Sequence, residues 1–159
     1  MVSAVKPIPD GYHAITPNLV CRNAERAIEF YKTVFGASEL MRMPGPGGKI
    51  MHCELKIGNS NLFVNDEISQ SPADAGRSGA PFISLFLYVE DVDGVFSRAL
   101  SAGAKVEMPL QDMFWGDRFG KISDPSGHVW GLATHKEDVA PAEMKRRSAS
   151  FAGKAAGQS

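Results

Sequence analysis

The segment ahead of the last predicted hairpin carries two aromatic rings and a charged pair, in the run Phe114-Trp115-Gly116-Asp117-Arg118. The Arg118 guanidinium could bind a carboxylate or a phosphonate through two parallel hydrogen bonds, and the Trp115 ring could stack on a planar ligand. A structural interpretation is equally open, in which Asp117 and Arg118 fix the loop while Trp115 fills the core or a dimer contact. The segment is therefore a candidate wall of a ligand cavity.

Histidine supplies the other candidate chemistry, because its imidazole changes charge near neutral pH. Among the four histidines, His52 is the strongest candidate for a general base or a ligand contact, since it lies within a predicted strand. Alternation along this strand places His52 and Glu54 on one face and Met51 and Cys53 on the other. The His52 face can meet either solvent or a cavity. We expect the other three histidines to bond backbone groups or to lie at strand ends.

Two helices are predicted, because apolar residues recur at helical spacing after a capping residue. Asn23 caps a helix over residues 24–35, and Asp91, 68 positions later, caps a helix over residues 92–100. Gly36 and Gly103 are expected to end them. Between and after the helices, residue alternation and turn residues predict strands. These strands are expected at 13–20, 37–43, 49–57, 61–65, 82–89 and 105–110, with two more in 112–135.

The matching halves predict a duplicated β-α-β-β-β module. We expect a lead-in at residues 1–12, a first module at 13–67, a linker at 68–81, a second module at 82–135 and a tail at 136–159. In the tail, a short helix is predicted from Pro141 through Arg147, followed by disorder. A sheet with one helix leaves its other face uncovered, so two such sheets can close around a concave space suited to a small ligand.

Composition and charge argue against several classes of partner. The 159 residues carry a net charge of −1, so no overall field draws the chain to nucleic acid or to an anionic membrane. No apolar run is long enough to span a bilayer, and the N-terminus lacks the apolar core of an export signal. Cys21 and Cys53 form no CxxC motif, which favours two buried, reduced thiols in a cytoplasmic protein. No glycine-rich fingerprint predicts a dinucleotide cofactor.

Several motifs recur in a characteristic order over residues 10–140. They are TPNLV, RAIEFYKTVFGA, MPGPGGKIMHCEL, LYVEDVD, FWGDRFGKISDPSGHVW and LATHKEDV. This order resembles the vicinal-oxygen-chelate superfamily, which includes glyoxalase I, fosfomycin- and bleomycin-resistance proteins and extradiol dioxygenases. Within it, the sequence is most similar to the PhnB-like glyoxalase/bleomycin-resistance branch. The resemblance implies an α+β fold of two paired βαβββ modules whose sheets form a cup-shaped cavity, in a homodimer.

The resemblance also implies where a divalent metal would sit, because enzymes of the superfamily take His or Glu ligands from the first and last strands of each half. The corresponding positions are Thr16, Ser84, Gly131 and either Phe63 or Val64. None of them offers the imidazole, carboxylate or thiolate that zinc, iron or nickel requires. We therefore predict no metal centre and no other cofactor. This departure also argues against lactoylglutathione lyase and dioxygenase activity.

The predicted function is the binding of a small organic ligand in the cup. The residues expected to contact it are Thr16, Asn65, Ser84, Trp115 and Arg118, with His52 as the candidate catalytic residue. Three of these are small polar side chains that could hydrogen-bond a ligand where a metal would otherwise lie. The alternative is a lyase, isomerase or dioxygenase of the same superfamily that holds Zn, Ni, Mn or Fe through displaced ligands.

Overall fold

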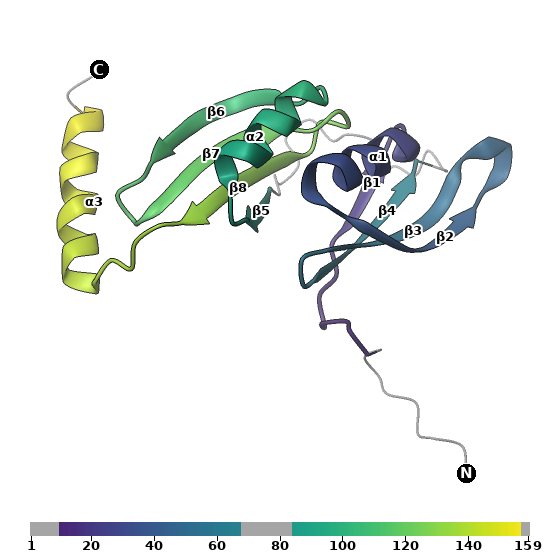
Figure 1. Ribbon diagram of the computed structural model, residues 1–159, viewed down its shortest axis with the longest axis horizontal. Helices are drawn as coiled ribbons and strands as arrows, with labels where there is room; N and C mark the ends of the chain where they lie inside the picture. The colour runs from purple at the N-terminus through teal and green to yellow at the C-terminus, as the bar shows by residue number, and fades with distance from the viewer. Residues whose placement is uncertain (1–9, 68–83, 157–159) are drawn as a thin grey trace, which may run out of the picture. The chain divides into compact units, whose positions relative to one another are not determined.

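A computed structural model describes residues 10–67 and 84–156 of the chain (Figure 1). The chain divides into two compact units, residues 1–81 and 82–159. The predicted linker at 68–81 and most of the predicted lead-in at 1–12 lie outside the described residues. Each unit is considered by itself below.

The first unit is a four-stranded sheet with one helix across one face (Figure 1). In chain order its elements are β1 (Asn18–Cys21), α1 (Ala24–Phe35), β2 (Ser38–Pro44), the 3₁₀ turn η1 (Pro46–Gly48), β3 (Ile50–Ile57) and β4 (Ser60–Asp66). The strand order is β1-β4-β3-β2, with β1 parallel to β4 and the other pairs antiparallel.

The second unit repeats this topology. Its elements are β5 (Leu85–Tyr88), α2 (Val92–Ser101), β6 (Lys105–Asp112), β7 (Asp117–Ser123), β8 (Val129–His135) and α3 (Pro141–Ala156). The strand order is β5-β8-β7-β6, and β5 is parallel to β8. The predicted α+β architecture of two βαβββ modules is thus confirmed.

Both predicted helix caps are also confirmed. Asn23 Oδ1 accepts a hydrogen bond from Arg26 N at 3.1 Å, and Asp91 Oδ1 accepts one from Gly94 N at the same distance. Gly36 then takes a left-handed conformation with φ of 67° at the end of α1, as a glycine at this position can without steric cost. The short polar side chains therefore define where each helix begins.

Each helix is also anchored to the last strand of its own sheet. In the first unit, Asp66 Oδ1 accepts from Ala24 N at 2.8 Å, and in the second, Thr134 Oγ1 accepts from Val92 N at 2.9 Å. Asp66 and Thr134 lie 68 positions apart, as the helix caps do. The internal repeat thus extends to a buried contact that satisfies an otherwise unpaired N–H of the first helical turn.

The core of each unit lies between its helix and one sheet face. In the first unit this layer includes Tyr31, Leu55, Val64 and both cysteines, and in the second it includes Phe96, Ile122, Trp130 and Leu132; all are buried. Trp130 Nε1 donates to Asp124 Oδ2 at 2.9 Å. The opposite face of each sheet carries the residues of functional interest, and it is called the open face below.

Some boundaries differ from the predicted ones. The strand expected at 13–20 is β1, which begins only at Asn18, because Pro17 has no N–H to donate to a ladder. The strand expected at 82–89 is β5, shortened to Leu85–Tyr88 within the described residues. The tail helix α3 continues to Ala156, nine residues beyond Arg147, where the sequence predicted disorder to begin. The alanine-rich run at its end contains no proline, so it can propagate a helix.

Helix α3 packs against the turn between β6 and β7. The rings of Phe151 and Phe114 lie 5.2 Å apart, and Arg147 donates to the carbonyl of Phe114 and pairs with Glu137. In Figure 1, α3 lies beyond the end of β6 and β7. Among the described residues, no helix has the length and apolar character needed to cross a membrane.

Candidate functional site

The open face of the second sheet carries a row of aromatic rings. Phe86 and Phe119 are stacked, with centroids 5.3 Å apart and planes 7° from parallel. Tyr88 extends the row at 4.8 Å from Phe86, and Trp115 extends it at 5.7 Å from Phe119. Phe86 is 50% exposed and Tyr88 60% exposed. These four residues, here named the aromatic row, lie on the side of the sheet away from α2, where Phe119 itself is buried.

Gly131 lies beneath the aromatic row. It is the register partner of Phe86 in β5, and a Cβ added to it would stand 2.9 Å from Phe119 Cε2 and 3.2 Å from Phe86 Cδ2. Only glycine lets both rings lie this close to the strand. The position where the resemblance implies a metal ligand is thus covered by stacked aromatic rings.

A buried carboxylate bonds the two outer rings of the aromatic row, Tyr88 and Trp115. Asp117 is 2% exposed and accepts hydrogen bonds from Trp115 Nε1 and Tyr88 Oη, both at 2.9 Å. Its other oxygen lies 2.8 Å from Nδ1 of His135. Burial opposes ionisation, but the hydrogen bonds from His135, Tyr88 and Trp115 outweigh it and hold the pKa of Asp117 below its usual value. Asp117 therefore fixes the orientation of two rings in the row.

His135 joins Asp117 to the segment that leads into α3. Its Nε2 lies 2.8 Å from Asp138 Oδ1, so both ring nitrogens face carboxylates. Asp138 and then Asp117 raise the pKa of His135, because both stabilise the imidazolium. Beside it lies a hollow of about 600 Å³, lined by Tyr88, Val89, Glu90, Thr134 and His135.

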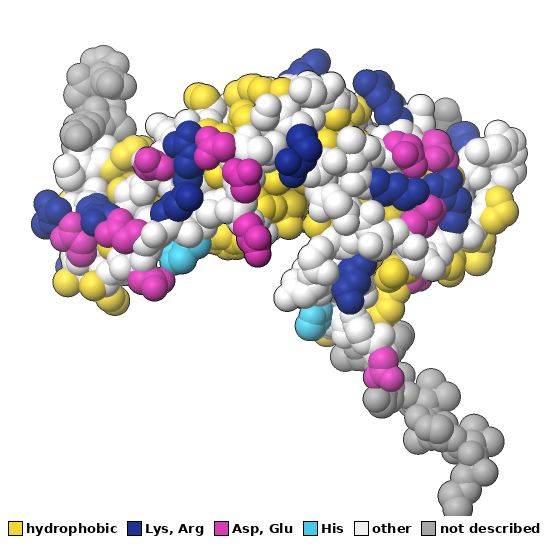
Figure 2. Space-filling view, viewed as in Figure 1, with side chains coloured by type: hydrophobic (Ala, Val, Ile, Leu, Met, Phe, Trp, Pro, Cys, Tyr) yellow, Lys and Arg dark blue, Asp and Glu magenta, His cyan; other side chains and the backbone are white. Residues whose placement is uncertain are grey.

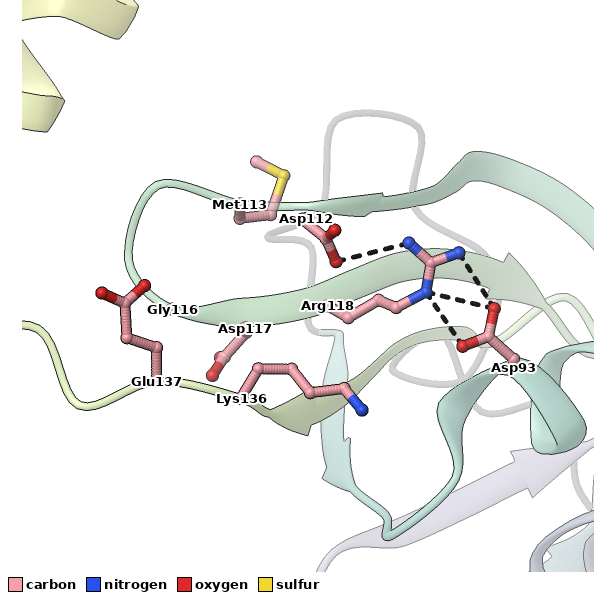
Figure 3. Close-up of a pocket in the computed structure, with 8 residues that line it drawn as sticks. All are labelled: Asp93, Asp112, Met113, Gly116, Asp117, Arg118, Lys136 and Glu137. Atoms are coloured by element: carbon pink, nitrogen blue, oxygen red, sulfur yellow. Dashed lines mark hydrogen bonds and ion pairs between the residues drawn. The ribbon is translucent and has the colours of Figure 1, made fainter.

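Arg118 points away from the aromatic row. Its Nε and Nη2 donate to the Asp93 carboxylate on α2 at 2.9 Å, and its Nη1 donates to Asp112 at 3.3 Å (Figure 3). Along β7, Arg118 faces the helix side, whereas Asp117 and Phe119 face the open side. Trp115 and Arg118, which the sequence placed in one constellation, therefore lie on opposite faces. The contacts favour the interpretation in which Arg118 fixes the loop.

The hollow next to Arg118 is strongly charged. It measures about 590 Å³ and is lined by Asp93, Asp112, Met113, Gly116, Asp117, Arg118, Lys136 and Glu137 (Figure 3). Its lining includes four acidic residues and two basic ones, and the carboxylates of Asp93 and Asp112 bond Arg118. In Figure 2, basic and acidic side chains lie beside one another over both units instead of gathering in patches of one sign. On this face, the distribution agrees with the small net charge.

The open face of the first sheet carries a different cluster. His52 Nε2 lies 3.1 Å from Glu54 Oε1, and Tyr12 Oη donates to the other oxygen of Glu54. The ring of Phe63 stands edge-on to His52, with centroids 4.8 Å apart. Hydrogen bonds from Tyr12 and then His52 hold the pKa of Glu54 below its usual value, and the bond to Glu54 raises the pKa of Tyr12. Glu54 is thus ionised and Tyr12 protonated at neutral pH.

The other predicted ligand contacts are dispersed. Thr16 is half-buried just before β1, and Ser84 is exposed just before β5. Asn65 lies on the open face of β4, where its Nδ2 donates to the carbonyl of Asp66.

Sequence reasoning missed Tyr12, Phe86, Tyr88 and Phe119. Alternation in Leu85-Phe86-Leu87-Tyr88 would have placed two of these rings on one face, whereas nothing near Tyr12 in the sequence indicates its contact with Glu54.

The residues at the expected metal positions do not fit a metal. Phe63 and Gly131 offer no ligand atom, and two rings fill the space above Gly131. Within residues 10–67 and 84–156, no three His, Cys, Asp or Glu side chains gather in an arrangement that could hold a metal ion. The donor set therefore disagrees with the metal centre that the resemblance implies.

The fold is that of a known family of proteins built from paired modules. The sequence profile of the Glyoxalase/Bleomycin resistance protein/Dioxygenase superfamily matches residues 12–132. The chain belongs to this superfamily.

Individual relatives agree with this assignment. The uncharacterized protein Mb0911c of Mycobacterium bovis is 42% identical over 131 residues, which cover 79% of this chain and 86% of that protein. The crystal structure of TioX from Micromonospora sp. ML1 matches with a TM-score of 0.62 and 31% identity, over 77% of this chain and 98% of TioX. A PhnB protein from Bacillus cereus matches with a TM-score of 0.63 at 21% identity, over 77% of this chain and 99% of that protein, which supports the fold alone.

Proposed function

We propose that this protein binds a small, planar organic ligand on the open face of its second sheet, against the aromatic row. The observation that carries the proposal is the pair of exposed rings, Phe86 and Tyr88, backed by the buried ring of Phe119 above Gly131. Leaving large aromatic rings in water costs free energy, and a contiguous exposed apolar surface of this kind typically marks a binding site. Offset stacking on such rings favours a flat partner.

Polar groups at one end of the row supply orientation. Tyr88, Thr134 and His135 line the adjoining hollow, whose volume of about 600 Å³ suits a small molecule. The imidazolium of His135 can donate to an acceptor on the ligand if that acceptor replaces the exposed carboxylate of Asp138. Trp115, which bonds the same Asp117 oxygen as Tyr88, is retained as a ligand contact. The bonds of Arg118 to Asp93 and Asp112 leave Arg118 no part in this proposal.

A binding titration tests the proposal. The probes are 1-anilinonaphthalene-8-sulfonate, followed by its fluorescence, and bleomycin, chosen from the family description and followed by calorimetry. We expect Phe86→Ala and Tyr88→Ala each to weaken binding of the naphthalene probe about five- to tenfold, the loss of one stacking contact of about 1 kcal/mol. Phe151→Ala is the matched control, because Phe151 is a similarly exposed ring on α3. Equal affinity of all three variants and the unchanged protein would contradict the proposal.

The alternative function is a metal-dependent lyase, isomerase or dioxygenase with displaced ligands. Elemental analysis of the purified, dialysed protein distinguishes this metal-dependent enzyme from a metal-free ligand-binding protein. Stoichiometric Zn, Ni, Mn or Fe in a protein that binds neither probe would favour the alternative.

We also propose that the protein acts as a homodimer in the cytoplasm. The support is the resemblance of its fold to proteins that pair their modules, together with two buried, reduced cysteines. Light scattering after gel filtration is expected to give twice the chain mass of 17.1 kDa. A monomer at micromolar concentration would contradict the dimer.

A further inference from the structure

The first sheet carries a set of side chains arranged for proton transfer, which goes beyond the ligand binding proposed for the second sheet. Glu54 lies between Tyr12 and His52, and all three meet on the open face. His52 is 28% exposed and Glu54 19% exposed, so the pair is shielded and still reachable. No metal position that the resemblance implies coincides with His52, Glu54 or Tyr12.

The hydrogen bonds define which nitrogen of His52 is available. The Glu54 carboxylate is ionised and can only accept, so the contact of 3.1 Å requires the proton of the neutral ring on Nε2. Nδ1 then carries the lone pair. Within the described part of the chain, no group hydrogen-bonds to this Nδ1. The ring is thus held in the tautomer in which one nitrogen is oriented and the other can accept a proton.

Tyr12 strengthens this arrangement. Its hydroxyl occupies the second oxygen of Glu54, so the carboxylate is held from both sides and cannot rotate away from His52. The Tyr12 ring also approaches Phe63, with centroids 6.1 Å apart. Glu54 and Tyr12 are the titratable groups in contact with His52 or its partner, and the cross-strand neighbour Met43 is uncharged.

The surroundings of His52 suit a flat, apolar substrate. Phe63 stands 4.8 Å from the imidazole. On the same face, Met41 and Met43 of β2 are 41% and 46% exposed, and Val20 of β1 is 38% exposed. Thioether side chains adapt to irregular apolar partners. A planar organic molecule can therefore lie beside the base without burying an unpaired charge.

We infer that His52 is a general base that removes a proton from a weakly acidic C–H bond of a planar organic substrate, with Glu54 and Tyr12 as positioning residues. In this step the C–H bond breaks and the proton moves to Nδ1 of His52. The electron pair of that bond remains on the substrate, where it forms a new π bond and expels a leaving group. Glu54 stabilises the imidazolium that results.

The test is the ring opening of 5-nitrobenzisoxazole, a planar probe with one acidic C–H. Loss of its proton forms a nitrile as the N–O bond breaks, and the coloured phenolate leaves. We expect the full-length protein to catalyse this reaction. His52→Gln should lower kcat about 100-fold or more, the usual contribution of a general base. Glu54→Gln should lower kcat less and leave KM unchanged.

Controls separate this step from binding. His13→Gln changes an exposed histidine of the same unit and should leave the rate unchanged. The unreactive analogue 5-nitroindazole should bind equally to the unchanged protein and to His52→Gln, which also shows that the variant is folded. The inference would be overturned if the unchanged protein reacted no faster than His52→Gln, or if the analogue failed to bind to the unchanged protein. Neither result bears on the aromatic row, which the naphthalene probe tests separately.

Discussion

The two modules share a topology and differ in how each uses a carboxylate on its open face. In both, a tyrosine and a histidine bond one acidic residue: Tyr12 and His52 bond Glu54, and Tyr88 and His135 bond Asp117. Asp117 is buried and also accepts from a tryptophan, whereas Glu54 is partly open. His135 has carboxylates at both nitrogens, whereas His52 has one.

This difference separates a structural role from a chemical one. Both nitrogens of His135 face carboxylates, which raise its pKa and leave neither nitrogen open to a ligand. His52 has a carboxylate at Nε2 alone, and its Nδ1 has no hydrogen-bond partner within the described part of the chain. The same three residue types thus suit the second module for holding rings in place and the first for proton transfer.

The largest expected effect comes from Asp117→Asn. The amide would direct its N–H₂ toward a donor, leaving a buried group unpaired, so we expect the second unit to lose about 3 kcal/mol of stability. Glu54→Gln, in the more open cluster, should cost less than about 1 kcal/mol. Urea unfolding gives the free energy of unfolding of each variant. Tryptophan fluorescence follows the unfolding of Asp117→Asn, and far-ultraviolet circular dichroism follows that of Glu54→Gln. Equal losses would remove the distinction between the clusters.

Gly131→Ala should have the next largest effect. A methyl group there meets Phe119 and Phe86 at 2.9 and 3.2 Å, and overpacking of this kind costs about 1–3 kcal/mol. The double variant Gly131→Ala/Phe119→Leu should recover part of the loss, because the smaller side chain vacates that space. Thermal unfolding measures the loss of stability in the single variant and in the double variant. A fully stable single variant would show that the rings do not lie against the strand.

A smaller effect is expected from pH. Because the pKa of His135 is raised in the folded state, its contribution to stability is complete below the unfolded value of about 6.5 and is lost as pH rises through the folded value. The pKa of Asp117 is lowered, so its contribution is present above about 3.9 and is lost as pH falls through its folded value. His135→Gln should remove the loss of stability at alkaline pH and keep the loss of stability at acid pH. Urea midpoints measured from about pH 2 to pH 9 check both sides. An alkaline loss that persists in His135→Gln would contradict the expectation.

The smallest effect is expected from Arg118→Gln on ligand affinity. Since Arg118 lies on the helix side and is bonded to Asp93 and Asp112, its loss should change binding of the naphthalene probe less than about twofold. A tenfold loss would restore the sequence interpretation in which Arg118 clamps the ligand. The same titration on Trp115→Phe, which keeps a ring but loses the bond to Asp117, provides the comparison.

The sequence predicted those features that depend on local chemistry. The two caps and the 68-residue offset follow from short-range patterns, and the offset held as far as Asp66 and Thr134. The shared face of His52 and Glu54 followed from strand alternation.

Contacts between distant residues were beyond prediction from one sequence. Tyr12 reaches Glu54 across 42 positions, and Phe86 meets Phe119 through a register that no local pattern encodes. The length of α3 was also missed, because alanine and glycine in its last turns have opposite helix propensities and the packing of Phe151 on Phe114 is not visible in the sequence.

The distribution of two residue types gives each module its own reporter. Both cysteines are buried in the first unit, and burial raises the pKa of Cys53 to about 11, so its thiol reacts with an alkylating reagent only when that unit opens. Both tryptophans, Trp115 and Trp130, belong to the second unit. Alkylation kinetics therefore record the opening of one module and indole emission that of the other, in the unmodified chain and without an added label.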